Sequence, residues 1–221
     1  MQTTALHLIR HPFRLLVSGS SGKGKTTLIK KIVLNYFTKQ VDEIIIISPT
    51  ANSQFREPGF DEAEKIDNVE EGIGKITSMI EIRKRGDDSL KTRTLVIIDD
   101  AAGDKATNNR RKGDFAQLSV MTNHFNISVF GLFQQAKTCD ANFRDNVNGV
   151  IMFATTRLED MDILYKEYNP SIYLKKMVFF SLMDELWGPK QTNFCFIHKP
   201  ARNRICYFRN FEEIVDFTCL Q

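Results

Sequence analysis

The stretch Leu15-Leu16-Val17-Ser18-Gly19-Ser20-Ser21-Gly22-Lys23-Gly24-Lys25-Thr26-Thr27-Leu28 decides the fold of this chain. It fits the pattern G-x-x-x-x-G-K-[ST], the P-loop, which binds phosphate where a strand leads into a helix. The apolar run before the loop predicts a buried strand, and residues 26–37 after it predict a helix. Both flanks therefore have the structure that the motif requires, which favours nucleotide binding over a Gly/Ser/Lys-rich surface turn.

The spacing within the P-loop has a chemical reason. Gly19 and Gly24 permit backbone angles that other residues avoid, so successive N–H groups can turn toward phosphate oxygens. The start of the following helix adds partial positive charge at the same point. We expect Lys25 to reach the β- and γ-phosphates and Thr26 to ligate Mg²⁺. The residues expected to bind nucleotide are Gly19, Ser20, Ser21, Gly22, Lys23, Gly24, Lys25, Thr26 and Thr27.

Length and composition predict a single domain, with residues 13–168 as its core and 169–221 as a C-terminal extension. The 221 residues are 42% hydrophobic and 26% charged, which is ordinary for a globular protein. The net charge of +3 permits a local nucleic-acid surface without requiring one. The four cysteines have no C-x-x-C spacing, which favours reduced thiols. The apolar runs are too short to cross a bilayer, so we expect a reducing, aqueous compartment.

Strand-like and helix-like segments alternate along the chain. Continuous apolar runs predict strands near residues 13–18, 43–48, 94–99, 128–133 and 150–154. Helix-like segments occupy residues 26–37, 69–85, 115–124, 158–168 and 172–185. This order predicts an α/β fold of three layers with a mainly parallel central sheet, followed by a short extension with a hairpin formed by residues 194–197 and 204–208. Loops 51–60 and 87–93 are polar, and we expect them to be mobile.

A second motif is the apolar strand Thr94-Leu95-Val96-Ile97-Ile98 that runs into Asp99 and Asp100. Ligands bind at the carboxyl ends of such buried strands. We expect Asp99 to hold Mg²⁺, usually through water, and Asp100 to orient and polarise the attacking water. Glu is the commoner residue in the second role because its side chain reaches further. The alternative is an acidic strand end without a function.

The strand at residues 128–133 ends in Gln134 and Gln135. A buried strand seldom ends in two amides unless they bond to something. In one large division of P-loop NTPases a strand lies between the P-loop strand and the acidic strand, and its polar tip reaches the γ-phosphate. We therefore expect Gln134 to contact the γ-phosphate, with Gln135 close behind. Two exposed amides at the start of a loop are the alternative.

An arginine supplied by a second subunit can stabilise the charge of the transition state in a ring motor. Arg144 is the first candidate, because Asp145 and Asn146 can fix a turn that holds its guanidinium outward. The further candidates are Arg157, Arg110 and Arg111. The alternative for each of the four is an ordinary solvated arginine on the surface.

Two basic clusters are candidates for contact with a polyanion. The first is 83–85 with Lys91 and Arg93, and the second is Lys105 with 110–112. Neither has the interleaved aromatic residues of a base-stacking surface, so any contact would be with phosphates and without sequence preference. A merely solvated surface is the alternative in both cases.

The order of these motifs resembles the FtsK/HerA superfamily of RecA-like, additional-strand P-loop ATPases. In particular it is similar to the genome-packaging ATPases of poxvirus-like large DNA viruses and virophages. The resemblance covers roughly residues 13–168 and includes Ser48-Pro49-Thr50, Asp99-Asp100, the passage from 126 to 134, and Arg144-Asp145-Asn146 with the strand that follows. Cellular relatives carry a basic residue where this chain has Val150, which leaves the identity of a trans-acting arginine open.

The resemblance implies an ATPase that uses ATP with Mg²⁺ to translocate double-stranded DNA into a preformed capsid. It also implies a homo-oligomeric ring, a capsid or vertex protein as partner, no membrane, and a location at the viral assembly site in the host cytoplasm or in the virion. The alternatives are another FtsK/HerA-type DNA pump or helicase, a P-loop kinase of a small molecule, and a nucleotide-binding structural protein of the virion. A kinase is disfavoured because the chain lacks an arginine-rich lid.

Overall fold

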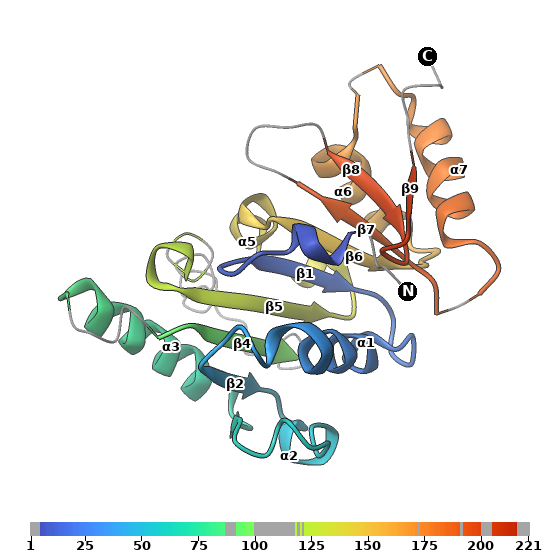
Figure 1. Cartoon of the computed structure of the whole chain (residues 1–221). Coiled ribbons are helices and arrows are strands. Elements are labelled where there is room, and N and C mark those ends of the chain that lie inside the picture. The colour runs from blue at the N-terminus through green and yellow to red at the C-terminus, as the bar shows by residue number, and fades with distance from the viewer. Residues whose placement is uncertain are drawn as a thin grey trace.

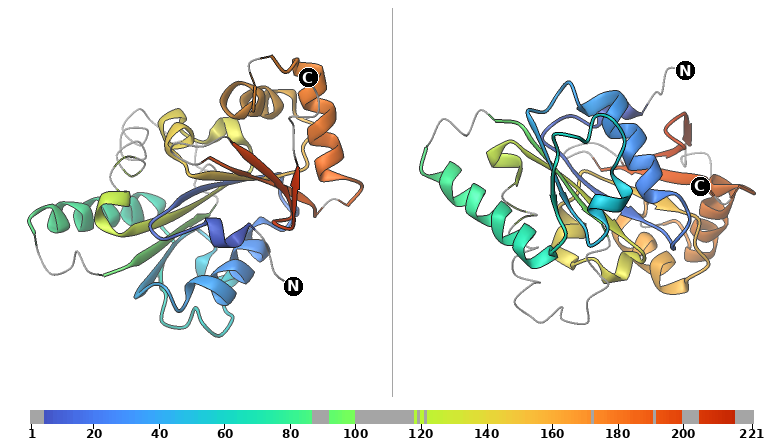
Figure 2. Two further views of the ribbon diagram at one scale, coloured as in Figure 1. Left: turned by 45° about the horizontal axis from the view of Figure 1, so that its top comes forward. Right: turned by 90° about the horizontal axis from the view of Figure 1, so that it is seen from below.

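The computed structural model describes residues 5–86, 92–99, 118, 120, 122–171, 173–190, 192–199 and 205–215. The strands of this part form one sheet of nine, in the order β3-β2-β4-β5-β1-β6-β7-β8-β9. Helices cover both faces of the sheet (Figures 1 and 2). The predicted three-layer α/β fold is confirmed.

The parallel part of the sheet consists of β1 (Arg14–Ser18), β2 (Glu43–Ile47), β3 (Glu64–Ile66), β4 (Thr94–Asp99), β5 (Ile127–Phe133) and β6 (Gly149–Phe153). β5 pairs with β1 on one side and with β4 on the other. The predicted insertion of a strand between the P-loop strand and the acidic strand is therefore confirmed. The short edge strand β3 was not predicted, because two of its three residues are charged.

The helices divide between the two faces. On one face lie α1 (Lys25–Ile32), its π-helical continuation η2 (Val33–Phe37), and α2 (Ala51–Gln54). On the other lie α3 (Val69–Lys84), α5 (Ala141–Asn146), α6 (Leu158–Tyr168) and α7 (Lys176–Trp187). The short 3-10 turns are η1 (Leu6–Leu8), η4 (Thr122–Phe125) and η5 (Ala136–Thr138). In the left view of Figure 2, α1 lies below the sheet, and α6 and α7 lie above it.

Most of the predicted helices agree with these bounds. The helices expected at 26–37, 69–85 and 158–168 are present, whereas the one expected at 172–185 begins only at Lys176. Residues 115–117, 119 and 121 of the helix expected at 115–124 fall outside the described residues, and its end forms the 3-10 turn η4 instead of an α-helix. No helix of the described part is long and apolar enough to span a membrane.

The strands have continuous apolar runs because both faces of the sheet are covered. Leu16 of β1 joins the core under α3, α6 and α7, whereas Leu15 and Val17 join the core under α1. Successive side chains of a strand point to opposite faces, so consecutive residues of such a strand are mostly apolar.

The C-terminal strands extend the same sheet. β7 (Phe194–His198) pairs antiparallel with β6, and β8 (Cys206–Arg209) and β9 (Glu213–Val215) follow antiparallel. The predicted hairpin is therefore present, but as a continuation of the central sheet. Trp187 at the end of α7 donates from Nε1 to the carbonyl oxygen of Met152 at 2.9 Å, which attaches α7 to β6.

The expectation of a mobile polar loop at residues 51–60 is wrong. This segment contains α2, and Phe55 and Phe60 within it are fully buried. Their rings meet edge to face with centroids 5.3 Å apart, in the core on the α1 face. Two aromatic side chains thus fix a segment that is otherwise polar. Residues 87–91 of the other expected loop lie outside the described residues.

Two members of the first basic cluster bond within the chain, whereas Arg85 is exposed. Arg83 is only 3% exposed and donates to the carbonyl oxygen of Phe125 at 2.5 Å and to Thr94 Oγ1 at 2.7 Å. Arg93 forms an ion pair with Asp42 at 2.8 Å. Both guanidinium groups are thus engaged within the chain. Lys91 and the whole second cluster fall outside the described residues.

Candidate nucleotide-binding site

The P-loop joins β1 to α1 and contains two glycines with left-handed backbone angles. Gly24 has φ 95° at the start of α1, as its position in the motif predicts, and Gly22 has φ 77°. Gly19 does not have a positive φ, so the reason expected for it is wrong. A Cβ atom on Gly19 would lie 2.7 Å from Cβ of Phe153. Gly19 is therefore needed for the close approach of the loop to β6.

The P-loop holds the ammonium group of Lys25 through its own backbone. Lys25 is 9% exposed, and its Nζ donates to the carbonyl oxygens of Gly19 at 2.6 Å and Ser20 at 3.1 Å. These contacts keep a positive charge inside the loop, at the N-terminus of α1. A phosphate binds favourably at such a point, because both the ammonium and the helix dipole attract it.

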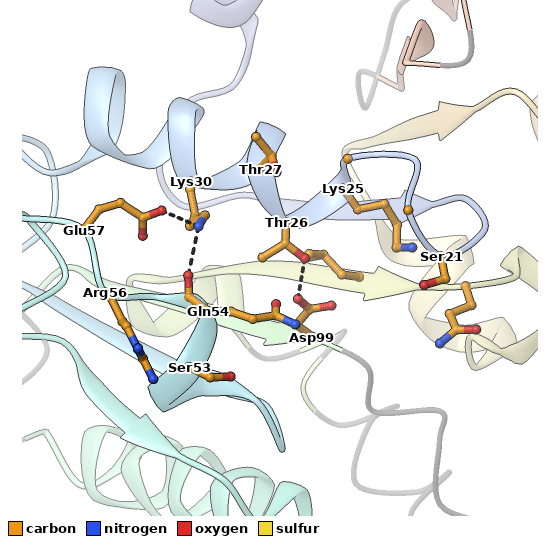
Figure 3. A pocket seen from close by; sticks show the side chains of 14 residues that line it. Ser21, Lys25, Thr26, Thr27, Lys30, Ser53, Gln54, Arg56, Glu57 and Asp99 are labelled. Carbon is orange, nitrogen blue, oxygen red and sulfur yellow. Dashed lines mark hydrogen bonds and ion pairs between the residues drawn. The ribbon is translucent and has the colours of Figure 1, made fainter.

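Two oxygen ligands meet beside Lys25. Thr26 Oγ1 donates a hydrogen bond to Asp99 Oδ2 at 2.7 Å, across 73 positions of sequence (Figure 3). Asp99 lies at the end of β4 and is 6% exposed. A hydroxyl and a carboxylate are hard oxygen ligands, the kind that Mg²⁺ prefers in combination with substrate phosphates. Asp100, predicted to polarise the attacking water, lies outside the described residues.

A cleft of about 570 Å³ opens over these groups. One side of it, which we call the P-loop wall, consists of Ser21, Gly22, Gly24, Lys25, Thr26 and Thr27. The floor consists of Asp99, Leu132 and Gln134. The opposite side, which we call the α2 wall, consists of Ser53, Gln54, Arg56 and Glu57. The α2 wall was not predicted, although Phe55 and Phe60 are a signal that its segment packs against the core.

Lys30, one turn beyond Thr26 on α1, connects the two walls. Its Nζ donates to the carbonyl oxygen of Gln54 at 2.8 Å and forms an ion pair with Glu57 (Figure 3). It also lies 5.9 Å from the centre of the Phe55 ring. The hydrogen bond from Lys30 lowers the pKa of Glu57. The charge of Lys30 is therefore used to hold the α2 wall.

The segment that follows Gln134 is held in place from α6 and α5. Arg157 Nη1 donates to the carbonyl oxygen of Gln134 at 3.3 Å, and the N–H of Lys137 donates to Asp160 Oδ1 at 3.3 Å. Asp160 is 2% exposed, and burial raises its pKa. Arg144 Nη1 donates to the carbonyl oxygen of Cys139 at 2.5 Å. These contacts fix the position of the backbone at Gln134 and in the segment that follows it.

The expectation that Arg144 projects outward is wrong. Its side chain is 11% exposed and pairs with Glu167, from Nε at 3.0 Å and from Nη2 at 2.9 Å. Asp140 caps the N-terminus of α5, so residues 141–146 form a helix and not the expected turn. The helix directs the guanidinium toward α6. Arg157, by contrast, is exposed, and Arg110 and Arg111 lie outside the described residues.

Comparison with protein families decides where the chain belongs. Residues 2–209 match the model of the family described as poxvirus A32 protein. The chain belongs to this family. The predicted resemblance to poxvirus-like ATPases is thereby confirmed. A sequence comparison with curated proteins returned no significant match.

Solved structures share the fold of this A32-family chain. The pCW3 conjugation coupling protein TcpA with ATPγS has a TM-score of 0.63 and 13% identity, over 90% of this chain and 60% of TcpA. The genome packaging NTPase B204 of Sulfolobus turreted icosahedral virus 2 with AMPPCP has a TM-score of 0.62 and 12% identity, over 89% of this chain and 98% of B204. The B204 DNA-packaging ATPase of Sulfolobus turreted icosahedral virus has a TM-score of 0.60 and 13% identity, over 94% of this chain and 100% of B204. At such identities the likeness establishes the fold.

The structure of this A32-family member gathers most of the predicted site in one cleft. Lys25, Thr26, Asp99 and Gln134 all line it, together with the P-loop wall. They come from three neighbouring strands, because β1, β5 and β4 are adjacent in the sheet and run parallel. Arg144 does not line the cleft; it bonds to the backbone of the segment that follows Gln134.

Proposed function

We propose that this chain is an ATP-hydrolysing DNA translocase that packages double-stranded viral DNA into a preformed capsid. The observation that carries the proposal is the cleft in which Lys25, the Thr26–Asp99 pair and Gln134 converge. Membership of the A32 family and a fold shared with a viral genome packaging NTPase support it.

The proposed substrate is ATP with Mg²⁺. The Thr26 hydroxyl and the Asp99 carboxylate fit that ion, because they already lie within 2.7 Å of each other and are both hard oxygen ligands. Magnesium, when bound, would act as a Lewis acid toward the phosphate oxygens. The P-loop N–H groups and Lys25 would bind the β- and γ-phosphates, and Gln134 would contact the γ-phosphate.

Asp99 and Asp100 have different proposed roles. Asp99→Asn should weaken binding of the magnesium nucleotide, because it removes a charged ligand. Asp100→Asn should leave binding intact and abolish turnover, because it removes the group proposed to polarise the attacking water. Nucleotide titration and single-turnover hydrolysis separate these outcomes.

We further propose that the two arginines act differently. Arg144 holds the segment after Gln134 within its own subunit, which its ion pair with Glu167 supports. Arg157 is the better candidate for a trans-acting arginine, since it is exposed and lies next to the carbonyl group of Gln134. Its planar guanidinium suits the oxygens of a phosphoryl group.

DNA, a homo-oligomeric ring and a capsid or vertex protein are the proposed partners, at the viral assembly site in the host cytoplasm or in the virion. The family resemblance supports all of them. Contact with DNA would be made to phosphates, so it should weaken steeply with salt and show no sequence preference.

The test is the ATPase rate with and without duplex DNA, measured together with the oligomeric state. A packaging motor should be stimulated by duplex DNA and should be active as an assembly. Stimulation by a nucleoside instead of DNA would support the kinase, strand separation would support a helicase, and nucleotide binding without turnover would support a structural protein of the virion.

A further inference from the structure

A second glutamine faces the cleft, from the α2 wall, whereas Gln134 belongs to the floor. Gln54 is the last residue of α2 and belongs to the α2 wall. Figure 3 shows its side chain extending across the cleft in the direction of Asp99. Gln134 and Gln54 thus both line the space next to the Thr26–Asp99 pair.

The sheet order explains why the two amides lie on either side of Asp99. β4, which ends in Asp99, is flanked by β2 and β5. Gln134 follows β5 directly, and Gln54 lies in the segment that follows β2. Because all three strands are parallel, the segments after them meet at the same edge of the sheet.

The backbone of Gln54 is fixed, whereas its amide is not engaged. Its carbonyl oxygen accepts from Lys30 at 2.8 Å, and the next residue, Phe55, is fully buried. The side chain is exposed, and its amide forms no hydrogen bond with any residue in the described part of the chain. A rigid support beneath an uncommitted polar group is what a ligand-binding side chain needs.

The other polar side chains of the α2 wall bond locally. Ser53 Oγ donates to the carbonyl oxygen of Thr50 at 2.9 Å, and Arg56 Nε donates to that of Asn52 at 3.1 Å. Glu57 pairs with Lys30. Gln54 therefore differs from its neighbours on this wall, because its side-chain amide forms no hydrogen bond within the described residues.

We propose that Gln54 is a catalytic residue that orients the attacking water against the γ-phosphate. This inference rests on the proposed ATPase activity. An amide has both an acceptor and donors, so Oε1 can accept from the water while Nε2 donates to a γ-phosphate oxygen. An amide does not take a proton at neutral pH, so Gln54 acts by position and not as a base.

The reaction that Gln54 assists is hydrolysis of the terminal phosphoanhydride. The water oxygen forms a bond to the γ-phosphorus while the bond from phosphorus to the β–γ bridging oxygen breaks. The bridging oxygen leaves with ADP, and the water protons end on the released phosphate and in solvent. Gln54 is unchanged by the reaction.

The experiment compares Gln54→Met with Asn52→Leu in the full chain. Met keeps the length of Gln without its hydrogen bonds. Asn52 is an exposed amide of the same helix that does not line the cleft, so Asn52→Leu is a matched control. Single-turnover hydrolysis is measured, together with the affinities for AMPPCP and for ADP–aluminium fluoride, which mimics the phosphoryl group in transfer.

Gln54→Met should lower single-turnover hydrolysis by on the order of 100-fold, as expected when one group that contacts the transition state is lost. It should weaken the affinity for ADP–aluminium fluoride but not that for AMPPCP, and Asn52→Leu should change neither. The inference is overturned if Gln54→Met hydrolyses ATP like the unchanged protein, or if both affinities fall together, which would indicate a structural role. An unchanged protein that does not hydrolyse ATP would overturn the proposed function as well.

Discussion

The P-loop wall and the α2 wall face each other across one cleft, but they are built in different ways. The P-loop wall is made by residues of one short loop and the start of α1, and the loop is held by its own bonds, such as that from Lys25 to the carbonyl group of Gly19. The α2 wall depends on distant contacts: Lys30 on α1 holds Gln54 and Glu57, and Phe55 enters the core. A phosphate-binding loop can thus be encoded by neighbouring residues, whereas the α2 wall that faces it forms only when distant segments pack into the core. The following predictions test this contrast.

The largest effect is expected when the P-loop wall is broken at Lys25. Lys25→Ala should lower ATP hydrolysis by about 10²–10³ or more, because it removes a cation that contacts the transferring phosphoryl group. The fold should survive, since the hydrogen bonds of Lys25 Nζ to Gly19 and Ser20 lie within its own loop. Steady-state ATPase and circular dichroism test both points. Lys31→Ala, on the exposed side of the same helix, is the control, and near-normal hydrolysis by Lys25→Ala would contradict the assignment.

Breaking the α2 wall at Phe55 should act through stability. Phe55→Ala removes a fully buried ring from the core and should lower the free energy of unfolding by about 3–5 kcal/mol. Urea denaturation measures the change, with Phe55→Leu as a milder variant that retains most of the apolar volume. A loss of less than about 1 kcal/mol would mean that the core does not hold this wall.

Arg144 bonds to the segment that follows Gln134 on the floor of the cleft, so its loss tests a third part of the site. Arg144→Ala removes the pair with Glu167 and the bond to Cys139, and should cost about 1–3 kcal/mol of unfolding free energy. Mixing Arg144→Ala subunits with Lys25→Ala subunits should restore no ATPase, because Arg144 acts within its own subunit. The same mixture made with Arg157→Ala should restore part of it. Recovery of ATPase activity in the mixture with Arg144→Ala would instead mean that Arg144 acts across a subunit boundary.

The smallest effect is expected for the partly exposed ion pair that joins the walls. Glu57→Gln should cost less than about 1 kcal/mol at neutral pH, because the Glu57 side chain is 43% exposed and solvent screens its attraction to Lys30. Lys30 lowers the pKa of Glu57 below its ordinary value of 4.5, so the stabilisation is present above that pH and disappears as the pH falls through the folded pKa. Unfolding free energies of the two proteins should therefore converge in acid. A difference that persists there would point to a contact other than the ion pair.

The features predicted correctly from the sequence depend on neighbouring residues, and those predicted wrongly depend on contacts between distant segments. The strand at residues 128–133 was predicted from its continuous apolar run, which is a local signal. Its place between the P-loop strand and the strand of Asp99 followed from the resemblance to P-loop NTPases that have an inserted strand, and it is confirmed. The reason for Gly19 was wrong, because its neighbour Phe153 lies on a strand more than a hundred residues away. The orientation of Arg144 was wrong as well, because its partner Glu167 belongs to another helix.

The P-loop, its flanking elements and the acid at the end of β4 could be read from the chain alone, since each depends on neighbouring residues and on the period of apolar side chains. Contacts between distant segments determine the α2 wall, the place of Gln54 in the same cleft as Gln134, and the burial of the Arg144 side chain. The physical reason is that the sequence near a polar side chain does not determine where that side chain points; the packing of the backbone that carries it does. Gln54 reaches the cleft because Phe55 is buried behind it and Lys30 holds its carbonyl group, and both of these depend on how α1 and the segment after β2 pack on the same face of the sheet.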